Sequence, residues 1–199
     1  MSKVVYIASS NASKLRELEV AGRDLPAVDL NVKPLLGLGD ISAPVENGTT
    51  FEENAALKAQ YYSDSTPECV IADDSGLEVD ALSGGPGIYS ARFAGPQATD
   101  KANNELLLRR LMRVEVRSAR FTCVLTLAKA GEVLRTFRAS VEGEILTAPQ
   151  GANGFGYDPL FFYPPLGRSF GELTFEEKLG VSHRGQAGRQ LFAYLVAWL

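Results

Sequence analysis

Two long strand-like runs, joined at the dipeptide Ala130-Gly131, constrain the fold of this chain more than any other feature. The runs cover residues 117–130 and 132–146, and a glycine-containing turn signal between two such runs is typical of a β-hairpin. We therefore expect a long hairpin in the second half of the chain, which requires the chain to fold around a sheet.

Strand and helix signals alternate before the hairpin. The apolar run 3–8 predicts a buried strand, and Ser9-Ser10-Asn11 would cap a helix patterned by Leu15, Leu18 and Leu25. Together with the hairpin, this alternation predicts a mixed sheet in an α/β or α+β fold. The other predicted elements are an extended stretch at 28–36, a helix opened by the capping box Thr50-Phe51-Glu52-Glu53, a strand at 69–72, a bend at 73–76, a half-buried strand at 77–82, a loop at 83–96, a helix at 99–114, an apolar stretch at 160–163, a capped segment from Thr174 and a final helix at 182–198.

Length and composition are those of an ordinary globular protein. The 199 residues are 45% hydrophobic and 22% charged, which argues against disordered and coiled-coil classes and predicts one domain over residues 1–199. The 20 basic and 24 acidic side chains give a net charge of −4, which offers no attraction to nucleic acid.

No apolar run predicts a membrane span or a secretory leader, so we expect a cytoplasmic protein. Cys69 and Cys123 lie in apolar runs without CxxC spacing and are expected to be reduced core residues.

Two polar segments that follow predicted strands suit the chemistry of phosphates. Ser9-Ser10-Asn11-Ala12-Ser13-Lys14 precedes a helix, where free backbone N–H groups, the helix dipole and the lysine favour an anion. Asp73 and Asp74 directly follow a strand, whose alternation sends their carboxylates to opposite sides. A carboxylate there could hold Mg²⁺ and orient or deprotonate an attacking water. A simple helix cap and a solvated turn are the structural alternatives for these two segments.

Two further segments suit a flat ligand rich in acceptors, such as a nucleobase. The run 151–158 places Phe155 and Tyr157 among glycines, so the backbone can approach a flat ligand while a ring stacks on it. Lys178 and the pair His183-Arg184 supply hydrogen-bond donors for base acceptors or phosphate oxygens. The structural alternatives are an irregular turn with Phe155 in the core and a buried histidine without a ligand.

Six short motifs follow one another in a fixed order. They are Ser10-Asn11-Ala12-Ser13-Lys14, Phe51-Glu52-Glu53-Asn54-Ala55 with Lys58-Ala59, Ala72-Asp73-Asp74-Ser75-Gly76-Leu77, Gly87-Ile88-Tyr89-Ser90-Ala91-Arg92, Gly154-Phe155-Gly156-Tyr157-Asp158-Pro159 and Ser182-His183-Arg184. In this order they resemble the inosine triphosphate pyrophosphatase family over nearly the entire chain. The first motif departs from the family's usual Thr-Gly-Asn, because Ser9-Ser10-Asn11 keeps a hydroxyl but not the glycine.

The resemblance implies an α/β fold in which a long twisted mixed sheet is flanked by helices, in two lobes with a central cleft, and it implies a homodimer. It also implies Mg²⁺-dependent hydrolysis of nucleoside triphosphates that carry hypoxanthine or xanthine, such as ITP, dITP and XTP. The bond between the α and β phosphates would be cut to give the monophosphate and pyrophosphate. Such an activity removes non-standard purines from the nucleotide pool.

The resemblance also implies roles for individual residues. Asp74 resembles the general base and metal-associated carboxylate, Lys58 a catalytic lysine that meets phosphates, and Glu46 a second acidic metal ligand. The implied substrate-binding residues are Ser9, Ser10, Asn11, Ala12, Ser13, Lys14, Ser75, Phe155, Gly156, Tyr157, Asp158, Lys178, His183 and Arg184.

Base preference would follow from O6, an acceptor in hypoxanthine and xanthine, which meets donors from His183, Arg184 or backbone N–H groups. The 6-amino group of adenine would leave those donors unpaired.

Three other functions compete with this interpretation. They are a pyrophosphatase for other modified or pyrimidine nucleotides, a nucleotide sensor that does not hydrolyse its ligand, and an RNA-binding module that stacks bases on Phe155 and Tyr157, which the net charge of −4 opposes.

Overall fold

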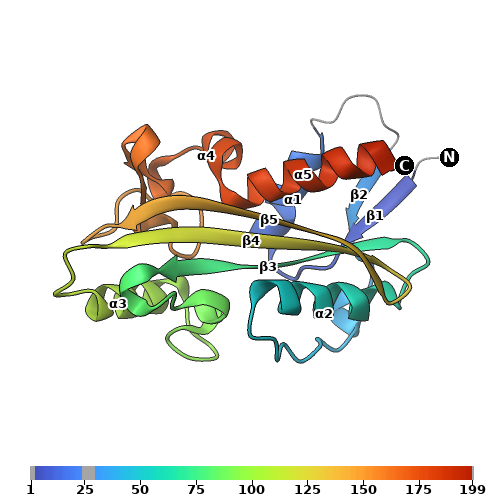
Figure 1. The fold of residues 1–199 in the computed structure, drawn as a ribbon, viewed down its shortest axis with the longest axis horizontal. Coiled ribbons are helices and arrows are strands. Elements are labelled where there is room, and N and C mark those ends of the chain that lie inside the picture. The colour runs from blue at the N-terminus through green and yellow to red at the C-terminus, as the bar shows by residue number, and fades with distance from the viewer. Residues whose placement is uncertain (1–2, 24–29, 199) are drawn as a thin grey trace. The chain divides into compact units, whose positions relative to one another are not determined.

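A computed structural model describes residues 3–23 and 30–198 (Figure 1). Its sheet has seven strands in the order β2-β1-β3-β4-β5-β6-β7. The pairs that β1 forms with β2 and β3 are parallel, whereas those of β6 with β5 and β7 are antiparallel, which confirms the predicted mixed α/β fold. The strands are β1 (Lys3–Ile7), β2 (Leu30–Pro34), β3 (Cys69–Val79), β4 (Ser118–Lys129), β5 (Glu132–Ile145), β6 (Phe161–Tyr163) and β7 (Arg168–Ser169), and the helices are α1 (Ala12–Arg23), α2 (Phe51–Ser63), α3 (Asp100–Arg110), α4 (Phe175–Val181) and α5 (His183–Trp198).

The described chain divides into two compact units, in agreement with the expected two lobes. Unit 1 comprises the described residues up to Asp74, 123–139 and those from Arg184 onward, and unit 2 comprises 75–122 and 140–183. The strands β3, β4 and β5 each contribute residues to both units. Neither unit is therefore a continuous stretch of chain.

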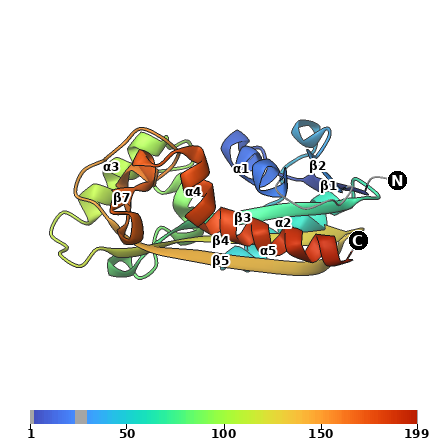
Figure 2. The ribbon, with the colours of Figure 1, turned by 90° about the horizontal axis from the view of Figure 1, so that it is seen from above.

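In unit 1, α1 and α5 cover one face of the sheet and α2 covers the other (Figures 1 and 2). Asn11 caps α1, because its Oδ1 accepts from the N–H groups of Ser13 and Lys14, both at 3.0 Å. At the start of α2, Thr50 Oγ1 accepts from Glu53 N as the capping box predicts, while the Glu53 carboxylate accepts from Thr49 N at 2.6 Å. Both caps fix where a helix begins and so place its lysine.

In unit 2, aromatic side chains form the centre of the core. The rings of Phe121 and Phe161 are 4.6 Å apart, and those of Phe161 and Phe170 are 4.9 Å apart. The capped segment predicted from Thr174 is α4, whose capping box joins Thr174 and Glu177. This packing holds the loops beside β6 against the sheet.

The bend predicted at 73–76 is wrong, because β3 runs without interruption from Cys69 to Val79. The acidic pair stays in the strand since each carboxylate meets a cation there, so it needs no solvated turn. The strand predicted at 69–72 and the one at 77–82 are thus one element, which ends at Val79. The hairpin of β4 and β5 is confirmed, and the predicted helix at 99–114 is shorter, at Asp100–Arg110.

The predictions for the two cysteines and for the extended stretch also agree with the described residues. Cys69 and Cys123 are free and buried. The extended stretch at 28–36 contains β2, although Val28 lies outside the described residues, as does Leu25 of the first helix pattern. Within the described part of the chain, none of the helices is both long and apolar enough to cross a membrane.

Candidate functional site

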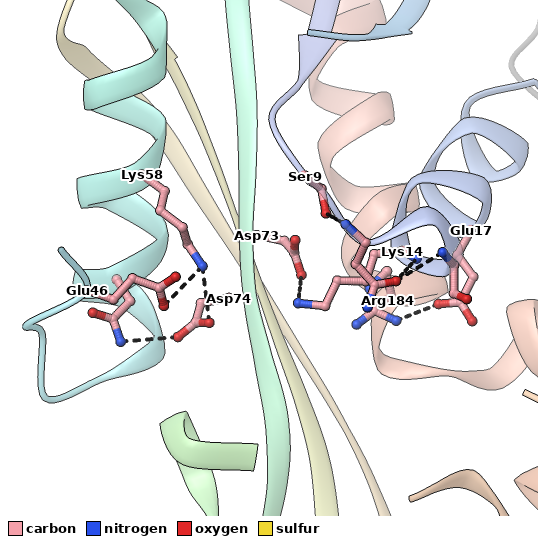
Figure 3. Close-up of polar contacts among 11 residues, drawn as sticks. Ser9, Lys14, Glu17, Glu46, Lys58, Asp73, Asp74 and Arg184 are labelled. Atoms are coloured by element: carbon pink, nitrogen blue, oxygen red, sulfur yellow. Dashed lines mark hydrogen bonds and ion pairs between the residues drawn. The ribbon is translucent and has the colours of Figure 1, made fainter. Parts of the chain in front are cut away.

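One face of β3 carries an ion pair between Asp73 and α1. Lys14 Nζ lies 2.7 Å from Asp73 Oδ2 (Figure 3). The lysine reaches this point because Asn11 starts α1 directly after β1, and Ser9 Oγ accepts from Asn11 N at 3.3 Å. The segment that was predicted to bind phosphate therefore places its cation against the sheet, within unit 1.

Asp73 is held ionised. Burial alone would raise the pKa of its carboxyl, but the positive charges of Lys14, Arg184 and Lys58 outweigh burial and hold that pKa well below its ordinary value. A carboxylate with such a low pKa is a poor proton acceptor. Asp73 is therefore suited to hold cations in place rather than to take a proton.

The opposite face of β3 carries Asp74 and α2. Lys58 Nζ lies 3.3 Å from Asp74 Oδ1 and 3.4 Å from Glu46 Oε2, so one ammonium bridges two carboxylates (Figure 3). The side chain of Lys58 is only 14% exposed. The predicted separation of Asp73 and Asp74 to opposite faces is thus confirmed, and Glu46 lies beside the same lysine as Asp74.

The environment shifts the pKa of Asp74 in the opposite direction from that of Asp73. Burial raises the pKa of Asp74, and the charges of Glu46 and Asp73 raise it further, against the opposing effect of Lys58 and Lys14. Burial lowers the pKa of Lys58, but the three carboxylates around it leave that pKa raised. Two adjacent carboxyls with opposite shifts are what an acid–base site needs when only one of them is to accept a proton.

Asn54 of α2 is a site residue that was not predicted individually from the sequence. Its Nδ2 donates to Asp74 Oδ2 at 3.3 Å, and its Oδ1 accepts from Gly48 N at 2.9 Å. Asn54 is fully buried, and a Cβ at Gly48 would lie 2.6 Å from Asn54 Oδ1. Asn54 therefore ties the carboxylate of Asp74 to the loop that carries Glu46. Its place in the capped motif 51–55 was the available signal.

Glu17 is a second residue that the sequence did not reveal. Its Oε2 accepts from Arg184 Nη1 at 2.5 Å, and both side chains are almost fully buried in unit 1 (Figure 3). Burial lowers the pKa of Arg184, but the negative charge of the neighbouring groups, that of Glu17 above all, leaves this pKa raised. No local pattern marks Glu17, because its partner lies at the start of α5.

The predicted base-binding segment belongs to unit 2. Phe155 is half-buried, and Lys178 Nζ lies 4.5 Å above the centre of its ring. Asp158 Oδ2 accepts from Phe155 N at 2.8 Å and from Lys178 Nζ at 2.6 Å. These contacts join three of the predicted substrate-binding residues into one cluster.

Tyr157 and His183 are more deeply buried than Phe155. Tyr157 donates its hydroxyl to Ser90 O at 2.8 Å, and burial, with the charge of Asp100, raises the pKa of that hydroxyl. His183 stacks on Phe121 with the ring centres 4.8 Å apart. Both aromatic side chains therefore serve the packing of unit 2 as well as any ligand contact.

The predicted site residues divide between the two units, and those of unit 1 lie on both faces of β3, with Lys14 on the α1 face and Glu46, Lys58 and Asp74 on the α2 face (Figure 3). Ser10 and Ser13 are exposed, and Ser75 is half-buried in β3. The set in unit 1 is Ser9, Ser10, Asn11, Ala12, Ser13, Lys14, Glu46, Lys58, Asp74 and Arg184, and the set in unit 2 is Ser75, Phe155, Gly156, Tyr157, Asp158, Lys178 and His183.

Oxygen donors that suit a divalent cation lie on the Asp74 side of β3. Mg²⁺ is usually held by one or two carboxylates together with waters and substrate phosphates. Glu46 and Asp74, gathered at one lysine, fit this requirement. Among residues 3–23 and 30–198, no three His, Cys, Asp or Glu side chains are grouped closely enough to form a metal site. A cation held by these two carboxylates would take its other ligands from waters and substrate phosphates.

The fold is mixed α/β, and its third strand carries a lysine–carboxylate pair on each face. The chain belongs to the Ham1 family, whose sequence profile matches residues 5–194. It is 52% identical over 196 residues to a dITP/XTP pyrophosphatase of Exiguobacterium sp. (strain ATCC BAA-1283 / AT1b), covering 98% of each chain. It is 50% identical over 199 residues to a dITP/XTP pyrophosphatase of Syntrophobacter fumaroxidans, covering 98% of this chain and 84% of that one.

Solved structures agree with this assignment. The Staphylococcus aureus Ham1 protein superimposes with a TM-score of 0.87 at 41% identity, over 99% of this chain and 100% of that one. A HAM1 protein from Coxiella burnetii superimposes with a TM-score of 0.88 at 38% identity, over 98% of this chain and 99% of that one. The fold predicted from the resemblance is therefore confirmed at the level of the family.

Proposed function

We propose that this protein hydrolyses purine nucleoside triphosphates whose base is hypoxanthine or xanthine, releasing the monophosphate and pyrophosphate. The observation that carries the proposal is the bridge from Lys58 to Glu46 and Asp74, in a chain about half identical to dITP/XTP pyrophosphatases over nearly its full length. The activity would remove non-standard purines from the nucleotide pool.

In the proposed reaction, Asp74 is the general base. Its carboxylate takes a proton from water, the water oxygen forms a bond to the α phosphorus, and the bond from that phosphorus to the bridging oxygen breaks so that pyrophosphate leaves. The raised pKa of Asp74 supports this role, because a base works best when its pKa lies near the working pH. Asp73, whose pKa is lowered, keeps Lys14 in position instead.

The lysines neutralise the phosphate oxygens that would otherwise repel the incoming water. Lys58 and Lys14 are the proposed cations. The segment Ser9 to Lys14 is proposed to contact the phosphates through its hydroxyls and the dipole of α1, since the N–H groups of Asn11, Ser13 and Lys14 already donate to Ser9 Oγ and Asn11 Oδ1. Glu46 and Asp74 would hold Mg²⁺, which supplies further neutralisation of phosphate charge when bound. Ser75 follows Asp74 in β3 and is proposed as a substrate contact.

The base is proposed to contact the residues of unit 2. Phe155 offers a ring for stacking, beside Gly156, Tyr157, Asp158 and Lys178. Donors from His183, Arg184 or the backbone would meet O6 of the base, whereas adenine would leave them unpaired. Each unpaired donor is worth about 1–3 kcal/mol, which corresponds to roughly 10- to 100-fold in rate.

The test is to incubate the protein with Mg²⁺ and, separately, dITP, XTP, dATP, dGTP and a pyrimidine nucleotide such as dUTP, and then to measure pyrophosphate and orthophosphate. Pyrophosphate released fastest from dITP and XTP is the expected result. Orthophosphate as the main product, or equal rates on all substrates, would refute the proposal. Binding without hydrolysis would favour a nucleotide sensor, and fastest turnover of dUTP would favour a pyrimidine pyrophosphatase.

We also propose that both units act as one catalytic domain, that the protein is a homodimer and that it works in the cytoplasm, where nucleotide triphosphates are made and used. The shared strands β3, β4 and β5 support the first point. For the dimer, Tyr89 is 56% exposed and stacks under Arg92 at 5.2 Å, an amphipathic surface suited to a partner. Light scattering of the purified protein, with Tyr89→Ser as the comparison, tests the dimer directly.

A further inference from the structure

Helix α3 binds both backbone polar groups of Gly156. Asp100 Oδ2 accepts from Gly156 N at 2.7 Å, and Asn104 Nδ2 donates to Gly156 O at 2.8 Å. Asp100 and Asn104 are four residues apart and lie on the same face of the helix. We call this pair the α3 clamp. The α3 clamp therefore binds both the N–H and the C=O of one loop residue.

The path of the loop depends on the backbone conformation of Gly156. Its φ is +63°, a conformation that favours glycine. On one side of it, Phe155 lies under the ammonium of Lys178. On the other side, Tyr157 enters the core and donates to Ser90 O. The peptide groups of Gly156 therefore influence the direction in which the Phe155 side chain leaves the backbone.

The loop has anchors other than the α3 clamp. Asp158 binds Phe155 N and Lys178, and Tyr157 binds Ser90. These bonds attach both ends of the segment to unit 2, so the α3 clamp is not required merely to keep the loop folded. It adds control over orientation at the one residue between the two aromatic side chains.

The side chain of Asn104 also carries an unsatisfied acceptor. Asn104 Oδ1 is buried and has no hydrogen-bond partner among the described residues. Buried acceptors without partners are rare in folded proteins because they are costly. The side-chain amide of Asn104 therefore makes its hydrogen bond through its donor, to Gly156 O.

We propose that Asp100 and Asn104 are positioning residues for base recognition. By fixing the peptide groups of Gly156 they hold Phe155 in the orientation that stacks on the purine ring and so places O6 of the base against its donors, and they thereby set the preference for dITP over dATP. Stacking depends on ring geometry, so a ring that is preorganised binds its base without a cost of ordering. This inference rests on the proposed function, in which Phe155 contacts the base.

The variants that test it are Asp100→Ala, Asn104→Asp and Asp100→Asn. Asp100→Ala removes one half of the α3 clamp, and Asn104→Asp replaces the donor with a carboxylate that repels Gly156 O. Asp100→Asn is the conservative variant, because its amide oxygen still accepts from Gly156 N. Asp100 is exposed, so its variants leave no buried hole and remain informative where an Asn104 variant fails to fold.

Asn103→Ala is the matched control. Asn103 lies on the same helix, is 3% exposed and also makes two backbone bonds, accepting from Ala94 N at 2.8 Å and donating to Ala91 O at 3.1 Å. Neither of these bonds reaches Gly156. This control should lose thermal stability and keep the base preference of the wild type.

The measurements are kcat and KM for dITP and dATP, together with inhibition by inorganic triphosphate, which has no base. We expect the dITP-to-dATP ratio of kcat/KM to fall at least ~10-fold in Asp100→Ala and Asn104→Asp, mainly through KM for dITP, and to stay within about threefold in Asp100→Asn. Inhibition by triphosphate should change by less than about twofold, because the phosphates are bound elsewhere.

A ratio that stays at the wild-type value in Asp100→Ala would overturn the role of the α3 clamp. So would a loss of triphosphate inhibition as large as the loss with dITP, or a fall of the ratio in Asn103→Ala equal to that in Asp100→Ala. If the wild type itself releases no pyrophosphate from dITP, it is the proposed function that fails. The two failures are therefore separated by the behaviour of the unmutated protein.

Discussion

Asp73 and Asp74 are consecutive in β3, yet their carboxylates are bound by lysines from different helices. Lys14 of α1 reaches Asp73 at 2.7 Å, and Lys58 of α2 reaches Asp74 at 3.3 Å. The same strand thereby gives its two acids different electrostatic surroundings, and their pKa values move in opposite directions. This difference is the reason for assigning the base to Asp74.

Replacement of Asp74 by asparagine should remove turnover. The amide keeps the shape of the side chain but cannot take a proton, so we expect kcat for dITP to fall at least ~100-fold. Steady-state pyrophosphate release measures the change, and the exposed Asp40→Asn serves as the control. Turnover of Asp74→Asn close to that of the wild type would place the base at another residue.

The lowered pKa of Asp73 predicts an acid-sensitive part of the stability. The unfolded carboxyl has a pKa of roughly 3.9, so as the pH falls below about 4 the unfolded chain takes up the proton first. Ionised Asp73 therefore stabilises the folded protein above this pH, and the contribution is lost as the pH falls toward the folded pKa.

Urea unfolding from pH 7 to pH 3 tests this prediction with Asp73→Asn. The variant should lose on the order of 2–3 kcal/mol at pH 7, less than a fully buried pair would, because the side chain of Lys14 is 19% exposed. Its stability should also decline less than that of the wild type between pH 5 and pH 3. Parallel pH profiles for the two proteins would contradict the assignment.

Asn54→Ala should weaken metal use as well as turnover. The change cuts the link between Asp74 and the Glu46 loop, so we expect a higher Mg²⁺ concentration at half-maximal rate and a kcat lowered about 10-fold. Ser63→Ala is a matched control, because Ser63 is also buried in α2 and accepts from a loop N–H, that of Gly131 at 2.9 Å. An equal rise in the Mg²⁺ requirement of both variants would mean that α2 itself had been loosened.

Arg184→Ala should first be a stability variant. It leaves Glu17 charged and buried without its partner in the Glu17–Arg184 pair, which costs about 3–5 kcal/mol. The double variant Arg184→Met with Glu17→Gln removes both charges and should recover much of the loss in thermal unfolding. Base preference is then measured in the double variant, where a reduced dITP-to-dATP ratio would support base reading by Arg184 and an unchanged ratio would speak against it.

Local sequence signals predicted the elements whose cause is local. The hairpin at Ala130-Gly131, the cap at Asn11 and the capped segment from Thr174 depend on residues close together in the chain, and all three are confirmed. The opposite directions of Asp73 and Asp74 followed from strand alternation alone.

Other features could not be predicted, because their causes are distant in sequence. Asp-Asp-Ser-Gly has the composition of a turn, and only Lys14 and Lys58, which arrive from other elements, allow β3 to continue through it. The same holds for Glu17, which is bound by Arg184 from the last helix, and for Asp100, which is bound to Gly156. Such pairs become visible only when the tertiary structure brings them together.

The close approach at Gly48 has a consequence for how this site tolerates sequence change. An added methyl group there would collide with Asn54 Oδ1 at 2.6 Å and with Glu53 Cβ at 2.7 Å, whereas one at Gly39 would meet nothing within 4 Å. Evolution or a saturation library could therefore vary position 39 freely, while at 48 even alanine would push the acidic loop outward. The close packing around Asn54, the hydrogen-bond partner of Asp74, thus depends on a residue that has no side chain.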